Sequence, residues 1–195
     1  TEFFGEDNVP LALKNEDEWY WYEYLPEYKV VYFQYDRCGN MDDLRFRDFN
    51  DEMLQFIDGH DVERMVVDLR YNGGGNSLVL KPFLKALEER PEIDVYTLIG
   101  RQTFSSALMN AVQLDELGAT LVGEPTGGRP NHYGEVRPFR LPNSGLPIFY
   151  ATRYFRELED RDPASLDPDI AVHPTIEDQL AGRDAVLEAT LEIAN

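Results

Sequence analysis

The sequence predicts an α/β domain built in layers, and three observations carry this prediction. Short apolar runs rich in β-branched residues alternate with amphipathic stretches, which is the order expected of a parallel sheet covered by helices. A glycine-rich turn, 73–75, directly follows the first of these buried runs, where open α/β sheets place their ligands. The composition, with 43% hydrophobic and 12% aromatic residues, is that of a globular protein. The predicted core strands lie at 64–69, 93–99 and 120–123, and the predicted helices at 41–58, 77–89 and about 107–114.

Length and charge limit the organisation of the chain and its partners. At 195 residues the chain is long enough to bury about 70% of its unfolded surface as one domain. Acidic residues number 37 against 18 basic ones, for a net charge of −19. Such a field repels nucleic acid and anionic membrane surfaces, so neither is expected as a main partner. Oligomeric state does not follow from the composition.

The number of cysteines and the first residues of the chain bear on the cellular compartment of the protein. Cys38 is the one cysteine, so no internal disulfide can form, and we expect a small buried residue there rather than a nucleophile. No run approaches the roughly 18 apolar residues of a membrane span, and no signal peptide is recognisable. The first residue is Thr1, which suggests a processed or cut chain. A cytosolic and a bacterial extracytoplasmic location both fit, and we favour the latter.

The N-terminal part is predicted to be an arm followed by an aromatic hairpin. Residues 1–17 are polar and acidic, and we expect an irregular lead-in. The segments 18–24 and 29–36 are aromatic and β-prone and are separated by a short Leu-Pro-Glu-Tyr break, which predicts two antiparallel strands. We expect one domain over 1–195, with arm and hairpin in 1–40 and the α/β core in 41–195.

The C-terminal part is predicted to hold a second hairpin and a closing helix. The segments 135–140 and 147–152 flank Pro142-Asn-Ser-Gly145, a turn sequence. The charged, proline-containing segment 156–169 predicts a loop. A helix is expected over 184–194, with Asp184 as its N-cap.

The glycine turn admits several interpretations. A dinucleotide fingerprint would need a third glycine where Leu78 stands, and a phosphate-binding loop would need a Gly-Lys-Ser/Thr sequence that the turn lacks. An oxyanion-binding turn needs only a free N–H at the strand end, and a plain tight turn needs nothing more than glycine. From the turn alone, the last two interpretations are about equally supported.

Four blocks in order resemble a known family. They are Val-Val-Asp-Leu-Arg-Tyr-Asn-Gly-Gly-Gly at 66–75, Thr-Phe-Ser-Ser-Ala at 103–107, Leu-Val-Gly-Glu-Pro-Thr-Gly-Gly at 121–128 and Leu-Asp-Pro-Asp-Ile at 166–170. Together they resemble the tail-specific, or C-terminal processing, serine proteases and the related core of tricorn protease. The resemblance covers roughly 60–190. It implies a ClpP/crotonase-like layered core with added β-hairpins, a polypeptide substrate and no cofactor.

The resemblance also implies site residues. Ser105 matches the nucleophile, and the N–H groups of Ser106 and Gly74 match the donors to the oxyanion of acyl transfer. A helix start, where Ser105 is expected, has free N–H groups and partial positive charge. The alternative for Ser105 is an ordinary helix N-cap.

The general base is harder to assign. Arg129 stands near the place of the lysine that tail-specific proteases use, and arginine keeps its proton at any working pH. The tricorn-like branch uses a histidine in a Gly-His-Ser/Thr sequence, which this chain lacks, and a late carboxylate, for which Asp162 is the candidate. The base is then either His132 or a histidine upstream of Thr1; His60 and His173 are expected at the surface.

Other functions remain open from the sequence. The histidines are scattered and no cysteine cluster occurs, so no metal site is predicted. A non-catalytic peptide-binding domain on the same scaffold is the main alternative to a serine peptidase, because the family's lysine is absent. A crotonase-like acyl-CoA enzyme is a weaker third option, since few basic residues are present to hold the CoA phosphates.

Overall fold

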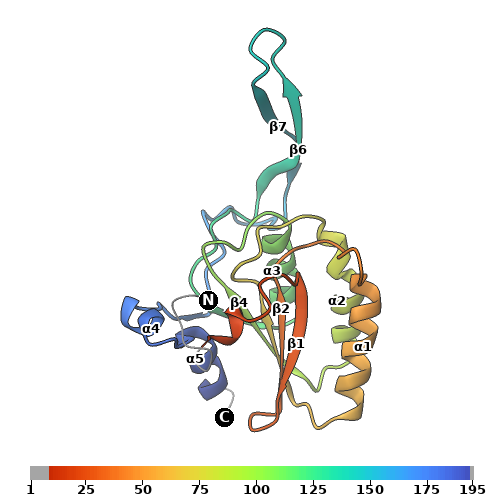
Figure 1. The fold of residues 1–195 in the computed structure, drawn as a ribbon, viewed down its shortest axis with the longest axis vertical. Helices are drawn as coiled ribbons and strands as arrows, with labels where there is room; N and C mark the ends of the chain where they lie inside the picture. The colour runs from red at the N-terminus through yellow and green to blue at the C-terminus, as the bar shows by residue number, and fades with distance from the viewer. Residues whose placement is uncertain (1–8, 194–195) are drawn as a thin grey trace.

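A computed structural model describes residues 9–193, so the predictions for residues 1–8 and for residue 194 lie outside the described residues. A six-stranded sheet in the order β1-β2-β3-β4-β5-β8 forms the centre, and a separate hairpin, β6-β7, projects from it (Figure 1). The strands are β1 (Tyr20–Leu25), β2 (Val30–Tyr35), β3 (Arg64–Asp68), β4 (Asp94–Ile99), β5 (Thr120–Gly123), β6 (His132–Arg140), β7 (Pro147–Phe155) and β8 (Ile170–Ala171). The helices are η1 (Leu11–Leu13), α1 (Phe46–Gly59), η2 (Ser77–Leu80), α2 (Lys81–Glu88), α3 (Ser106–Glu116), α4 (Ile176–Leu180) and α5 (Ala185–Ile193).

The sheet is mostly parallel, as the alternation of strands and helices predicts. β1 and β2 form the expected antiparallel hairpin, and β2 then pairs with β3 in parallel. The aromatic hairpin is thus the edge of the central sheet. The sheet continues in parallel through β3, β4, β5 and β8, so the carboxyl ends of these strands lie side by side at one end of the sheet. The turns that follow β3 and β4 are therefore neighbours, and this end of the sheet can hold a site.

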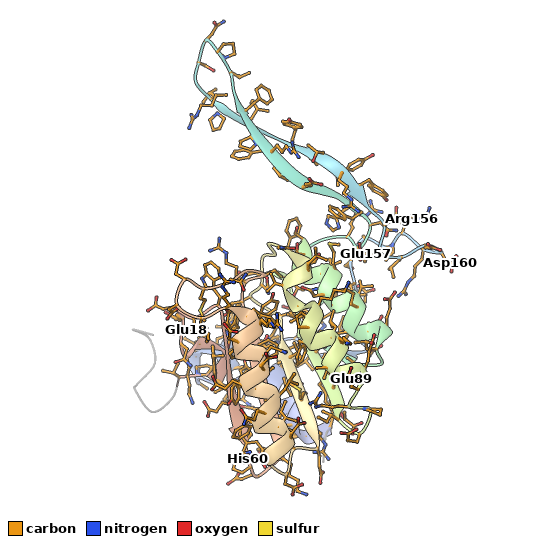
Figure 2. The ribbon with its side chains drawn as sticks, turned by 90° about the vertical axis from the view of Figure 1, so that its right-hand side faces the viewer. Glu18, His60, Glu89, Arg156, Glu157 and Asp160 are labelled. Carbon is orange, nitrogen blue, oxygen red and sulfur yellow. The ribbon has the colours of Figure 1, made fainter. Side chains whose placement is uncertain are left out.

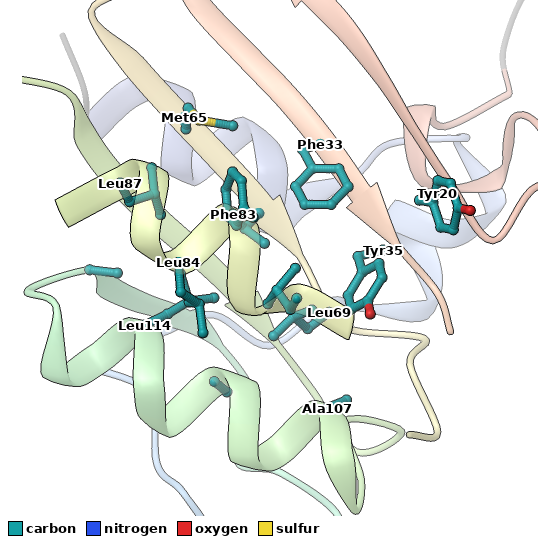
Figure 3. Packing of buried hydrophobic residues seen from close by; sticks show 14 of the residues in the cluster. Tyr20, Phe33, Tyr35, Met65, Leu69, Phe83, Leu84, Leu87, Ala107 and Leu114 are labelled. Carbon is teal, nitrogen blue, oxygen red and sulfur yellow. The ribbon is translucent and has the colours of Figure 1, made fainter. Parts of the chain in front are cut away.

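The core lies on both faces of the sheet. On one face α1, α2 and α3 cover a large cluster in which Phe33, Met65, Leu69 and Phe83 are fully buried (Figure 3). On the other face α5 covers a smaller cluster around Val66 and its neighbours. Every residue of β2 is buried, which is the pattern of a strand between two layers.

Several element bounds differ from the predictions. The first long helix begins at Phe46 rather than at 41, because the side chain of Asn40 accepts the N–H of Phe46 across a loop. β8 and α4 were not predicted, since two and five residues are too few for a periodic pattern. α5 matches its prediction, and Asp184 Oδ1 accepts the N–H of Leu187 at 3.1 Å, as an N-cap does.

The β6-β7 hairpin is longer than predicted and stands apart from the body. Its strands pair only with each other, over nine residues each. In Figure 2 the hairpin extends beyond Arg156 and Glu157, which lie where it joins the body. No helix within residues 9–193 is long and apolar enough to cross a membrane.

Candidate active site

Ser105 occupies a strained corner at the start of α3. It is the residue preceding the first helical residue, and its backbone has φ 52° and ψ −122°. A serine with positive φ is uncommon, and such strain is a recurring feature of functional sites. The side chain makes no capping hydrogen bond to α3, unlike the N-cap that the alternative interpretation requires. Ser105 is half-buried, so its hydroxyl is reachable from solvent.

Three hydrogen bonds tie the turn that precedes α3 to the turn after β3. Thr103 Oγ1 donates to the carbonyl oxygen of Leu69 at 2.8 Å, and the N–H of Phe104 donates to the carbonyl oxygen of Asn72 at 3.0 Å. Ser106 Oγ donates to the carbonyl oxygen of Gly75 at 2.7 Å. The first two of the family-like blocks are thereby fixed against each other.

Gly74 lies in direct contact with the serine corner. A Cβ built on Gly74 would be 2.9 Å from Ser105 Cβ and 3.0 Å from the backbone nitrogen of Ser106. Gly74 also has φ +106°, which side chains rarely adopt. Only glycine fits here without a shift, so the Gly-Gly-Gly turn packs directly against the Ser105 corner.

The two expected oxyanion donors, the N–H groups of Ser106 and Gly74, differ in whether another atom already accepts their hydrogen bond. The N–H of Ser106 is the first of α3 and has no backbone acceptor within the helix, as for every helix N-terminus. The N–H of Gly74 donates to Asn72 Oδ1 at 2.9 Å. It is therefore engaged within its own turn rather than free, which the glycine pattern did not predict.

Asn72 was missed as a site residue by the sequence reasoning. It is fully buried, its Nδ2 donates to the carbonyl oxygen of Tyr35 at 2.6 Å, and its Oδ1 also accepts from Cys38 Sγ at 3.6 Å. A signal was present, because asparagine commonly bonds the backbone N–H two residues on, which here is that of Gly74. Asn72 thus holds the turn after β3 in its present shape.

The third family-like block packs on the serine corner from the other side. A Cβ on Gly127 would lie 1.9 Å from the carbonyl oxygen of Arg101, and one on Gly128 would lie 2.8 Å from the ring of Phe104. Thr126 Oγ1 donates to the carbonyl oxygen of Gly128 at 3.0 Å and accepts the N–H of Leu166 at 2.9 Å. Phe104 stays 51% exposed, so an apolar surface flanks Ser105.

A buried ion-pair cluster lies beneath the β3 turn. Arg70 contacts Asp68, with Nη2 and Oδ2 2.6 Å apart, and also Asp184, with Nη1 and Oδ1 2.6 Å apart. Burial opposes ionisation of Asp184, but Arg70 holds the pKa of its carboxyl below the usual range. Burial raises the pKa of the nearby Asp36 to about 7, and Asp36 Oδ1 has no hydrogen-bond partner. These groups order the strand ends rather than contact Ser105.

The candidate base and carboxylate make contacts elsewhere. His132 Nδ1 lies 3.1 Å from the carbonyl oxygen of Pro130, and its ring packs against Phe155. Asp162 is exposed and pairs with Arg129 at 2.9 Å. Across residues 9–193, neither side chain forms a hydrogen bond or an ion pair with Ser105.

The other two histidines also make their contacts with residues other than Ser105. His60 stacks on Phe56 at the end of α1 farthest from the hairpin (Figure 2). His173 Nδ1 is 3.6 Å from Glu124 Oε1 at an exposed position. Within the described part of the chain no group of three or more His, Cys, Asp or Glu residues could hold a metal ion.

Comparison with solved structures confirms the fold. A candidate peptidase from Parabacteroides merdae is 20% identical with a TM-score of 0.65, over 90% of this chain and 64% of that one. A candidate S41 protease from Bacteroides fragilis is 18% identical with a TM-score of 0.61, over 89% of this chain and 56% of that one. A lipoprotein from Streptococcus agalactiae is 14% identical with a TM-score of 0.56, over 91% and 71%.

The comparisons support the predicted resemblance at the level of fold. The chain has the layered α/β fold of the candidate peptidase and the candidate S41 protease. It spans less than two thirds of the length of those two peptidases. No protein-family model matches the chain, and no curated protein matches it in sequence.

Proposed function

We propose that this chain is the catalytic domain of a serine peptidase that cleaves polypeptides through an acyl-enzyme on Ser105. The observation that carries the proposal is the contact of Gly74 with a strained serine at a helix start, whose hydroxyl does not cap that helix. A plain helix cap would use its hydroxyl on the helix, and a plain turn would not need glycine against a serine. The peptidase fold agrees with this assignment.

The arrangement suits acyl transfer step by step. Ser105 Oγ loses its proton to a base and forms a bond to the substrate carbonyl carbon, whose oxygen becomes an oxyanion. That oxygen accepts the N–H of Ser106, with the positive end of the α3 dipole behind it. The C–N bond then breaks, the amine leaves with a proton, and water hydrolyses the ester.

The second oxyanion donor, the N–H of Gly74, becomes available once its hydrogen bond to Asn72 Oδ1 breaks. The N–H of Gly74 donates to Asn72 Oδ1 in the structure, and a substrate oxyanion would compete with that neutral acceptor. A charged acceptor forms the stronger hydrogen bond, so the developing oxyanion is the favoured partner. The oxyanion would thus be bound by the N–H of Ser106, which has no acceptor within α3, and by the N–H of Gly74, which changes its acceptor during the reaction.

The base is a histidine from one of two places. His132 is the first residue of β6 and its ring packs against Phe155, so it would reach Ser105 only after a movement of the start of the hairpin. Alternatively, a histidine upstream of Thr1 could approach the half-exposed Ser105. Arg129 is excluded because it stays protonated and is paired with Asp162.

Hydrolysis of a fluorescently labelled unfolded protein tests the proposal. It is measured for this chain and for a version extended at the N-terminus, each with Ser105→Ala and with Ser144→Ala, a control at the exposed hairpin tip. We expect Ser105→Ala to reduce the rate of hydrolysis by about a thousandfold or more and Ser144→Ala to leave the rate unchanged. His132→Gln in both versions separates the two origins of the base. Turnover that survives Ser105→Ala would rule out the proposed nucleophile.

A non-catalytic peptide-binding domain is the second candidate function. Two observations favour it: the N–H of Gly74 is occupied by Asn72, and no described side chain between 9 and 193 bonds Ser105 as a base would. Peptide affinity that is unchanged by Ser105→Ala, together with no turnover by the extended version, would select this function.

A further inference from the structure

The β6-β7 hairpin carries an unusual share of the apolar surface. Eight of the fifteen large hydrophobic side chains that are exposed in the described residues belong to its 24 residues. An exposed set of this size on a soluble domain marks an interaction surface. The eight are Tyr133, Val136, Phe139, Leu146, Ile148, Phe149, Tyr150 and Tyr154, at 38–73% exposure.

Both faces of the hairpin are apolar, and both its edges are open. Tyr133 and Tyr154 form one aromatic pair, and Phe139 with Tyr150 forms another on the same face. Phe149, 66% exposed, lies on the opposite face because side chains alternate along a strand. The two-stranded sheet has no third strand, and an isolated hairpin is marginally stable in water. The hairpin therefore needs a partner.

The charge of the hairpin is opposite to that of the body. Residues 132–155 contain three arginines and one glutamate, for a net charge of +2. The other 171 residues contain 15 basic and 36 acidic residues, for a net charge of −21. A nine-residue strand is about 30 Å long, which exceeds the roughly 8 Å over which charges act at physiological salt. The far part of the hairpin thus presents basic and aromatic side chains beyond the screened field of the body, from which the hairpin projects in Figure 1.

We propose that the hairpin is an assembly arm that docks on the body of a second copy of this chain. The same molecule supplies the complementary charge, and reciprocal docking of two arms would form a closed two-fold dimer. Its 24 residues alone match the 20–30 residues per partner that a standard interface engages. None of the eight apolar side chains of the arm is assigned a role at Ser105, so this inference does not rest on peptidase activity.

The body offers a receiving surface of suitable chemistry. A groove of about 1050 Å³ lies between α1, α2 and α3. Leu78, 69% exposed, and Leu117, 41% exposed, form part of its apolar lining. Its charged lining is nearly balanced, with the acids Asp51, Glu88, Glu89 and Glu116 against the bases Arg47, Lys81 and Lys85, so the groove supplies apolar contact and the rest of the acidic body supplies the attraction. We assign this groove as the seat of the partner's arm.

Analytical ultracentrifugation of the chain from 1 to 100 μM tests the proposal. Phe149→Ser removes one arm side chain, and Ile176→Ser is a matched control because Ile176 is 71% exposed on α4, outside arm and groove. We expect a wild-type dimer, at least tenfold weaker dimerisation for Phe149→Ser and no change for Ile176→Ser. Raising NaCl from 50 to 500 mM should also weaken the dimer.

The contrary results are equally defined. A wild-type chain that stays monomeric at 100 μM, or a dimer that Phe149→Ser leaves intact, overturns the proposal. A monomer that co-sediments with phosphatidylcholine/phosphatidylserine vesicles in a Phe149-dependent way assigns the arm to a membrane surface instead. Leu78→Arg places a cation in the groove and should weaken the dimer; an unchanged dimer removes the groove as the seat of the arm.

Discussion

Gly74→Ala tests the contact between the glycine turn and the serine corner. The new Cβ would lie 2.9 Å from Ser105 Cβ and 3.0 Å from the carbonyl oxygen of Phe104, so the two turns must separate. Such overpacking costs about 1–3 kcal/mol, and an alanine held at φ +106° costs about 1–2 kcal/mol more. Alanine also lowers the entropy of the unfolded chain, which offsets about 0.5–1 kcal/mol. We expect a net loss of about 1–4 kcal/mol in unfolding free energy.

Gly73→Ala is the matched control for this prediction. A Cβ on Gly73 would have no heavy atom within 4 Å, so the same substitution one residue earlier should change stability by less than about 1 kcal/mol. Urea unfolding followed by circular dichroism measures both variants. If Gly74→Ala unfolds at the wild-type urea midpoint, or if the two variants are equally destabilised, the packing of the two turns is not as described.

Two further predictions concern buried charges. Burial raises the pKa of Asp36 to about 7 in the folded protein, against about 4 in the unfolded chain, so the folded state binds this proton more tightly. The free energy of unfolding should therefore fall by up to about 4 kcal/mol as pH rises from about 4 to 7. Urea unfolding across this pH range should show a flatter profile for Asp36→Asn, and an equally steep profile would contradict the assignment. Arg70→Met leaves the carboxyls of Asp68 and Asp184 buried without their cation and should cost about 3–5 kcal/mol at pH 7. Because Arg70 lowers the pKa of Asp184, the difference from wild type should shrink as pH falls below about 4, and a difference independent of pH would argue against the ion pair.

Much of the fold followed from periodicity. The buried runs at 64–69, 93–99 and 120–123 became β3, β4 and β5 because a strand between two layers is apolar on both faces. Periodicity does not predict elements of only a few residues, such as α4 and β8. α4 depends on a capping box between Thr175 and Asp178, and β8 on two residues pairing with β5.

The candidate site was only partly accessible to sequence reasoning. The order of the glycine turn and Ser105 along the chain predicts that they meet, because parallel strands end at the same edge of the sheet. The direction of a single N–H group does not follow from a Gly-Gly-Gly sequence, so the bond from Gly74 to Asn72 was not predicted. The ion pair of Arg129 with Asp162 depends on loops that carry no periodic signal.

Covalent labelling measures the reactivity of Ser105 most directly. The chain and its N-terminally extended version are treated with a fluorophosphonate probe, digested, and mapped by mass spectrometry. The account predicts a modified peptide that contains Ser105 in at least the extended version, with the label lost in Ser105→Ala and in Gly74→Ala but retained in Gly73→Ala. A folded, extended protein that carries no label at Ser105 would contradict the central claim that this hydroxyl is a nucleophile.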